Sequence, residues 1–105
     1  MKRLIHHEDG AILNVMTIDL EKNSETQPHF NKDRDEILFV LEGEINLLFD
    51  YGKSKLISSR NTDSWHLIKA NTTHQIECLT PTVKILEVIG GIHKDNSCII
   101  TEFKN

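Results

Sequence analysis

The sequence has no long hydrophobic run. A bilayer span needs about 20 consecutive apolar residues, and no segment of the chain approaches that length. The N-terminal stretch MKRLI begins with basic residues, but its apolar part ends after Leu4 and Ile5, which is too short for a signal peptide. We therefore expect a cytoplasmic protein with no membrane partner.

The sequence also lacks concentrated positive charge. It has 12 Lys and Arg residues against 16 Asp and Glu residues, for a formal net charge of -4, and no more than two basic residues are adjacent. A surface that follows nucleic-acid phosphates needs clustered Lys and Arg side chains. We expect no nucleic-acid partner.

Cysteine is scarce, and several catalytic motifs are missing. Cys78 and Cys98 are far apart and form no CxxC motif. We interpret them as free thiols of a reducing compartment, with a single disulfide as the less favoured alternative. The sequence has no nucleophile elbow, no Gly-rich phosphate loop and no dinucleotide-binding fingerprint. The candidate chemistry therefore depends on histidine and carboxylate side chains.

Short runs of alternating apolar and polar residues fill most of the 105-residue chain, without any long helical stripe. This alternation is typical of strands, and many short strands separated by turn residues predict an all-β sandwich or barrel. We expect a single domain over residues 1–105, with the barrel core at about 11–90. The predicted strands are 11–20, 25–31, 35–42, 44–50, 53–58, 64–68, 74–79, 82–90 and 97–103.

The alternation also predicts which polar side chains share the interior. Both faces of the strand that contains Glu36 are apolar apart from that residue, so we expect the strand to be covered on both sides. A buried acid costs free energy unless it is paired, hydrogen-bonded or bound to a metal. His29 and Asn31 share one face of their strand, and His74 lies on a later strand. We expect these four polar side chains to converge inside one barrel.

The stretch PHFNKDRDEILFVLEG resembles the first motif of the cupins. In that motif a His is followed two residues later by a second ligand, then by a Glu and a Gly, and these positions hold His29, Asn31, Glu36 and Gly43. IKANTTHQIECL resembles the second motif and places His74 at the remaining ligand position. The resemblance implies a double-stranded β-helix, that is, a jelly-roll barrel, with a pocket at one mouth.

A closer resemblance is to the small WbuC-type cupins of bacterial gene clusters for surface polysaccharide. Three stretches carry it: MTIDLEKNSETQPHFN, DEILFVLEGEINLLFD and IKANTTHQIECLTPTVKILEV. This resemblance implies a carbohydrate or a nucleotide-linked sugar as the small-molecule ligand.

The cupin resemblance also implies a metal site. The family binds one divalent ion with two His of the first motif, the Glu and the later His; here His29, Glu36 and His74 are present, and Asn31 replaces the second His. Two imidazoles and a carboxylate suit Fe, Mn, Zn or Ni. Asn31 offers only a weak, neutral oxygen, so we expect weakened metal binding. A metal-free polar pocket with cupin geometry is the alternative.

Three functions remain open at this point. The first is an enzyme of surface polysaccharide biosynthesis, in which a metal activates the substrate and His29 or His74 moves a proton. The second is a metal-free sugar-nucleotide isomerase or epimerase. Asn31 counts against it because an amide cannot shuttle a proton, and the diphosphate would need Arg34, Arg60 or Lys69. The third is a non-enzymatic module that binds a small polar molecule.

Other residues are given structural interpretations. We expect an exposed turn at His6-His7-Glu8-Asp9, a solvated loop at 32–35 on the pocket rim, and a solvated His93. Cys78 shares the face of His74, but we interpret it as a small buried residue. Trp65 is expected in the core or an interface rather than as a platform for a sugar.

We expect a homodimer. Cupin barrels have open edge strands, which short chains commonly cover by pairing. The apolar strands 11–20 and 97–103 are the expected interface.

Overall fold

The computed structural model describes residues 3–9, 13–49, 52–90 and 98–101. These residues form ten strands and no helix, so the all-β prediction is confirmed. None of the described segments is a helix with the length and hydropathy that a bilayer span requires. The strands are β1 (Arg3–Asp9), β2 (Leu13–Glu21), β3 (His29–Asn31), β4 (Glu36–Glu42), β5 (Glu44–Phe49), β6 (Lys53–Ser58), β7 (Trp65–Ile68), β8 (His74–Cys78), β9 (Thr82–Gly90) and β10 (Cys98–Ile100).

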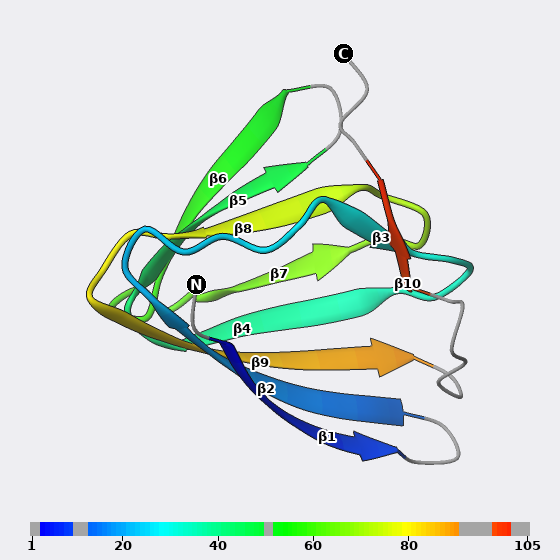
Figure 1. Cartoon of the computed structure of the whole chain (residues 1–105), viewed down its shortest axis with the longest axis horizontal. Helices are drawn as coiled ribbons and strands as arrows, with labels where there is room; N and C mark the ends of the chain where they lie inside the picture. The colour runs from blue at the N-terminus through cyan, green and yellow to red at the C-terminus, as the bar shows by residue number, and fades with distance from the viewer. Residues whose placement is uncertain (1–2, 10–12, 50–51, 91–97, 102–105) are drawn as a thin grey trace.

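The strands form two five-stranded antiparallel sheets. We call them sheet A, with the order β1-β2-β9-β4-β7, and sheet B, with the order β10-β3-β8-β5-β6. Figure 1 shows the two sheets as layers, with β5, β6 and β8 in the upper part of the view and β9, β2 and β1 in the lower part. The chain crosses repeatedly between the layers, as in a double-stranded β-helix, so the predicted fold class is confirmed.

The core lies between the sheets because each strand turns every second side chain inward. In β4 the buried residues alternate with partly buried ones, as the sequence predicts. The same period holds in β5, β8 and β9. The buried apolar cluster consists of Ile18, Leu20, Leu38, Val40, Ile45, Leu47, Ile57, Ile68, Ile76, Cys78, Val83 and Ile85.

Some strand predictions were wrong. Residues 6–9, expected as an exposed turn, belong to β1, which pairs with β2 from Arg3 opposite Leu20 to Asp9 opposite Asn14. Backbone pairing thus overrides the polar composition of this segment. Strand β2 also pairs with β9, so it is not an edge strand and cannot form an edge-to-edge dimer contact.

One predicted strand is shorter than expected, and another is described only in part. Of the segment 25–31, only His29–Asn31 forms a strand, and Glu25 makes an isolated bridge to Glu77. Of the segment 97–103, Cys98–Ile100 forms β10, which pairs with β3. Trp65 is 49% exposed and lies outside the core, so of its two expected places only an interface remains as a prediction.

Gly43 makes the tight connection from β4 to β5. Its φ is +87°, in the left-handed region. A Cβ here would collide with the Thr82 carbonyl oxygen and lie 2.5 Å from Thr80 Oγ1. Glycine is therefore required by both backbone conformation and space. This turn keeps β5 in sheet B directly after β4 in sheet A.

Candidate functional site

Three strands bring the predicted site residues together. His29 on β3 lies directly opposite His74 on β8, within sheet B. Glu36 begins β4 in sheet A and reaches the same region from the facing layer. His74 is 0% exposed, Glu36 1% and Asn31 5%, whereas His29 is only partly buried. Among these four side chains, His29 is thus the one most accessible from solvent.

The four side chains are connected by short contacts. The Asn31 amide nitrogen donates a hydrogen bond of 3.0 Å to Glu36 Oε1. The other carboxylate oxygen, Glu36 Oε2, lies 3.5 Å from His74 Nε2. The rings of His29 and His74 lie 4.2 Å apart between centroids, with a tilt of 56°. The sequence-predicted convergence of these residues is therefore present in the structure.

Backbone carbonyl oxygens orient both imidazoles. His29 Nδ1 lies 2.8 Å from the Gln27 carbonyl oxygen, and His74 Nδ1 lies 3.0 Å from the Thr72 carbonyl oxygen. A carbonyl only accepts, so Nδ1 of each ring carries a proton. In the neutral ring Nε2 then carries the lone pair, which is the arrangement found in metal-binding histidines.

The donor set fits a divalent ion in its chemistry. Two ligands on a tetrahedral ion with bonds of about 2.1 Å lie about 3.4 Å apart, which is close to the separation of His74 Nε2 and Glu36 Oε2. Glu36 Oε2 is buried and makes no hydrogen bond. The described residues nevertheless contain no group of three or more His, Cys, Asp or Glu side chains already arranged around one point. Binding one ion by all three side chains would therefore require them to move closer together.

The Asn31 side chain contacts the carboxylate of Glu36. Because an ionised carboxylate only accepts hydrogen bonds, the nitrogen of the Asn31 amide faces Glu36. The side chain therefore holds the carboxylate in position. This contact accounts for an Asn at the position where a ligand was expected.

A pair of loops joins the two motifs. Asp33 and Asn71 both have φ near +60°, at 59° and 66°, which is unusual for residues other than glycine. The two residues form mutual hydrogen bonds: the Asp33 backbone N–H donates to Asn71 Oδ1, and Asn71 Nδ2 donates to Asp33 Oδ1. In addition, the Asn71 backbone N–H donates to the Asn31 carbonyl oxygen. The Ala70 N–H donates to Asp35 Oδ1 at 2.8 Å. The predicted rim loop 32–35 thus ties the strand of Asn31 to the loop that precedes His74.

The sequence analysis missed a second buried carboxylate. Glu87 on β9 is 2% exposed and lies opposite Leu38 of β4. It faces the interior with Ile85 and Ile89, as the alternation in TVKILEVIG could have indicated. Because Glu36 lies opposite Ile89, the two acids occupy neighbouring layers of the same inner face.

Other candidate residues lie elsewhere. Cys78 is a free thiol in the hydrophobic core, opposite Ile45, and burial raises its pKa. Arg60 and Lys69 are exposed and Arg34 is partly buried. His93 lies outside the described residues.

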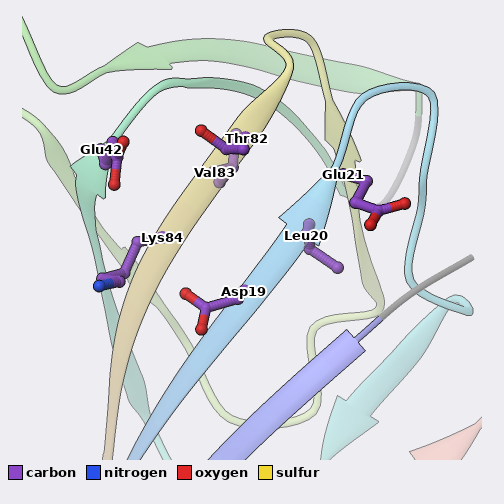
Figure 2. Close-up of a pocket in the computed structure, with 7 residues that line it drawn as sticks. All are labelled: Asp19, Leu20, Glu21, Glu42, Thr82, Val83 and Lys84. Carbon is purple, nitrogen blue, oxygen red and sulfur yellow. The ribbon is translucent and has the colours of Figure 1, made fainter.

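A hollow of about 330 Å³ lies at the opposite ends of β4 and β9 from Glu36 and Ile89. Figure 2 shows Lys84 between the carboxylates of Asp19 and Glu42 at this hollow. None of the four converging side chains lines it. It is therefore separate from the candidate site.

Comparison with known proteins supports the fold. No family model matches the sequence, and no curated protein matches it. A conserved protein with a double-stranded β-helix domain from Klebsiella pneumoniae is similar, with a TM-score of 0.82 and 12% identity over 96% of this chain and 80% of that one. An RmlC-like cupin family protein from Methanocaldococcus jannaschii is also similar, with a TM-score of 0.75 and 12% identity over 87% of this chain and 82% of that one.

The capsular polysaccharide assembling protein CapF from Staphylococcus aureus is also similar. Its TM-score is 0.77 and its identity 15%, over 96% of this chain but 34% of CapF. These likenesses show that the chain has the cupin fold. The closer resemblance to WbuC-type cupins stays a prediction.

Proposed function

We propose that the chain is a small metal-dependent cupin whose divalent ion is bound by His29, Glu36 and His74. The observation that carries this proposal is Glu36 Oε2, which is buried, makes no hydrogen bond and lies 3.5 Å from His74 Nε2. Burying an ionised carboxylate costs free energy unless a cation or hydrogen bonds compensate. A divalent ion beside Nε2 supplies this compensation, and Fe, Mn, Zn and Ni all accept imidazole and carboxylate ligands.

The chain's own groups have distinct roles in this proposal. When bound, the ion would polarise a carbonyl group or lower the pKa of a water molecule. Asn31 holds Glu36 through its amide hydrogen bond, and the Gln27 and Thr72 carbonyls fix the two rings. His29 is partly exposed, so it is the site residue nearest to an incoming ligand. A role for His29 in proton transfer belongs to the metal-free candidate below, in which its Nε2 holds no ion.

We propose a carbohydrate or a nucleotide-linked sugar as the ligand, in cytoplasmic surface polysaccharide biosynthesis. The support is the sequence resemblance to WbuC-type cupins, together with the likeness in fold to CapF. The partly exposed imidazole of His29 also suits a ligand rich in hydroxyl groups, because imidazole nitrogens form hydrogen bonds with hydroxyls.

A metal-free acid/base site is the second candidate function. The same Glu36–His74 contact favours it, because a proton on His74 Nε2 would turn the contact into an ion pair. Asn31 counts against a mechanism that needs two histidines of the first motif. This pocket could serve an isomerase or a non-enzymatic sugar-binding module.

A calorimetric titration separates the two candidates. Untagged protein is stripped of metal and titrated with Mn²⁺, Fe²⁺, Zn²⁺ and Ni²⁺, alongside His74→Ala. His66→Ala is the matched control, because His66 also faces inward but stacks on Phe49 at 5.3 Å. We expect one ion per chain in the wild type and in the control, and loss of this binding in His74→Ala. Equal stoichiometry and affinity in all three proteins would remove the metal assignment.

A further inference from the structure

Lys55 lies on the inner face of sheet B although it is charged. It comes two residues before the buried Ile57, and it lies opposite Leu47, which is also buried. Alternate residues of a strand face the same side, so Lys55 points inward with both of them. It is partly buried, whereas its neighbours Ser54 and Leu56 are exposed. Lysine side chains are normally solvated, so an inward lysine is a candidate binding residue.

His66 faces Lys55 from the other sheet. It lies on β7 opposite the buried Leu38, so it also points inward. Its ring stacks on that of Phe49 of β5, with 5.3 Å between centroids and an angle of 25°. Burial lowers the pKa of His66, and the charge of Lys55 lowers it further, so the two basic groups are close to each other. The edge strands β6 and β7 thus bring together Lys55 and His66, which we call the basic pair.

No acidic side chain of the described residues forms an ion pair or a hydrogen bond with either member of the basic pair. Glu87 is the acid of β9 in the inward row of His66, but Leu38 lies between them. Their strands are therefore two spacings, or ~10 Å, apart. Two partly buried basic groups repel each other when both are charged, and an anion between them removes this repulsion. The basic pair therefore favours an anionic group of a ligand.

Solvent reaches the inner face of the barrel at the basic pair. Lys55, His66 and Phe49 are partly exposed although all three face inward. The inward residues Leu47 and Leu38 beside them are fully buried. A ligand can therefore reach the basic pair from solvent without opening the core.

The candidate site adjoins the basic pair. His29, His74 and Phe49 are in register on three neighbouring strands of sheet B, and Lys55 lies on the next strand, β6. Because neighbouring strands are about 4.8 Å apart, the strand of Lys55 is ~10 Å from that of His74. A monosaccharide with a phosphate group can bridge this distance.

We propose that Lys55 and His66 bind a phosphate group of the ligand, which is then a sugar phosphate or a nucleotide-linked sugar rather than a neutral carbohydrate. This inference rests on the proposed function, in which a sugar lies beside His29. Lysine binds phosphate as a point charge, and a neighbouring anion favours the protonated imidazole, which donates a hydrogen bond from each nitrogen. Arg60 and Lys69, which the sequence suggested for a diphosphate, are exposed, whereas Lys55 faces the interior.

The test titrates the full chain, without added metal, with inorganic phosphate and with acetate at matched ionic strength. Nuclear magnetic resonance follows the ring of His66. Phosphate should raise the pKa of His66, because a bound anion favours the charged imidazole, and acetate should raise it less. Lys55→Met should weaken phosphate binding about tenfold, since it removes a charged hydrogen-bond donor. Lys53→Met is the matched control, because Lys53 has the same strand and face but is exposed, and it should leave the affinity nearly unchanged.

His74→Ala distinguishes this proposal from the proposed metal site. This variant should lose the divalent ion but keep the response of His66 to phosphate. Lys55→Met should lose phosphate binding but keep the ion at the wild-type stoichiometry. A pKa of His66 that does not respond to phosphate would overturn the phosphate assignment and leave the metal assignment standing. Equal phosphate affinity in the wild type and Lys55→Met, or acetate binding as strong as that of phosphate, would do the same.

Discussion

Glu36 and His74 come from facing sheets, and His74 Nε2 lies 3.5 Å from Glu36 Oε2 in the interior. Neither strand alone could form this contact, so it depends on the closure of the two layers. The same strand β4 carries Glu36 and Leu38 inward and Ile37 and Phe39 outward. Strand β4 therefore supplies side chains both to the candidate site and to the outward face of sheet A.

The loop pair should matter to the site beyond its effect on stability. Asn71→Ala removes the mutual hydrogen bonds with Asp33, while Asn23→Ala is the matched control at another Asn with φ of 66°. Both variants replace an Asn, which tolerates a positive φ, by an Ala, which does not tolerate it as well. We expect Asn71→Ala to lower the free energy of unfolding by about 1 kcal/mol more than the control, and to weaken divalent-ion binding severalfold. Equal effects of both variants in urea unfolding and calorimetry would contradict this role.

Gly43→Ala should be far more destabilising than Gly52→Ala. Both glycines have positive φ, but a Cβ on Gly52 meets nothing within 4 Å, whereas one on Gly43 collides with the Thr82 backbone. The conformational strain costs about 1–2 kcal/mol at each position, and the collision adds about 1–3 kcal/mol at Gly43. Urea unfolding of the two variants measures the difference. Similar losses of unfolding free energy in the two variants would mean that the β4–β5 turn can relax to accept a Cβ at residue 43 without a free-energy cost.

Asn31→His should strengthen metal binding. The substitution supplies an imidazole at the position where the cupin pattern has its second His, and imidazole is a better ligand than an amide for transition ions. We expect the affinity for a divalent ion to rise about tenfold in calorimetry. An unchanged affinity would show that residue 31 acts on Glu36 alone and does not face the ion.

His66 should make the fold less stable in mild acid. Burial, and secondly the charge of Lys55, lower the pKa of His66 below its ordinary value of 6.5. The unfolded chain therefore binds this proton more tightly, and the stability that His66 contributes above pH 6.5 is lost as the pH falls below that value. Melting temperatures across this range should depend less on pH in His66→Gln.

Nuclear magnetic resonance titration checks the cause of this shift. Lys55→Met should raise the pKa of His66 toward 6.5, while Lys53→Met, on the same strand, should change it less. A wild-type pKa of His66 at or above 6.5 would contradict the account.

Strand period was the strongest signal in the sequence. It predicted the strands near 44–49, 53–58 and 82–90 and the inward direction of Glu36, because alternate burial follows directly from strand geometry. It failed at β1, where pairing with β2 decides the conformation of a polar segment. Glu87 lies at an inward position of the alternation in β9, as Glu36 does in β4, but it belongs to no recognised motif, so it was not predicted as a site residue.

Other parts of the site were not predictable from period or motif. The hydrogen bonds between Asp33 and Asn71 depend on positive φ at residues other than glycine, which the sequence does not mark. The turn of the Asn31 amide toward Glu36 likewise depends on the closure of the barrel. The alignment of outward side chains across sheet A likewise depends on the strand register, since it combines residues from separate strands.

The most direct test of the proposed metal site is anomalous diffraction from crystals grown with Mn²⁺ or Zn²⁺. We expect one peak at about 2.0–2.3 Å from Nε2 of His29, Nε2 of His74 and a carboxylate oxygen of Glu36. A map without a peak between these side chains, or with its peak only at the carboxylates of Asp19 and Glu42, would contradict it.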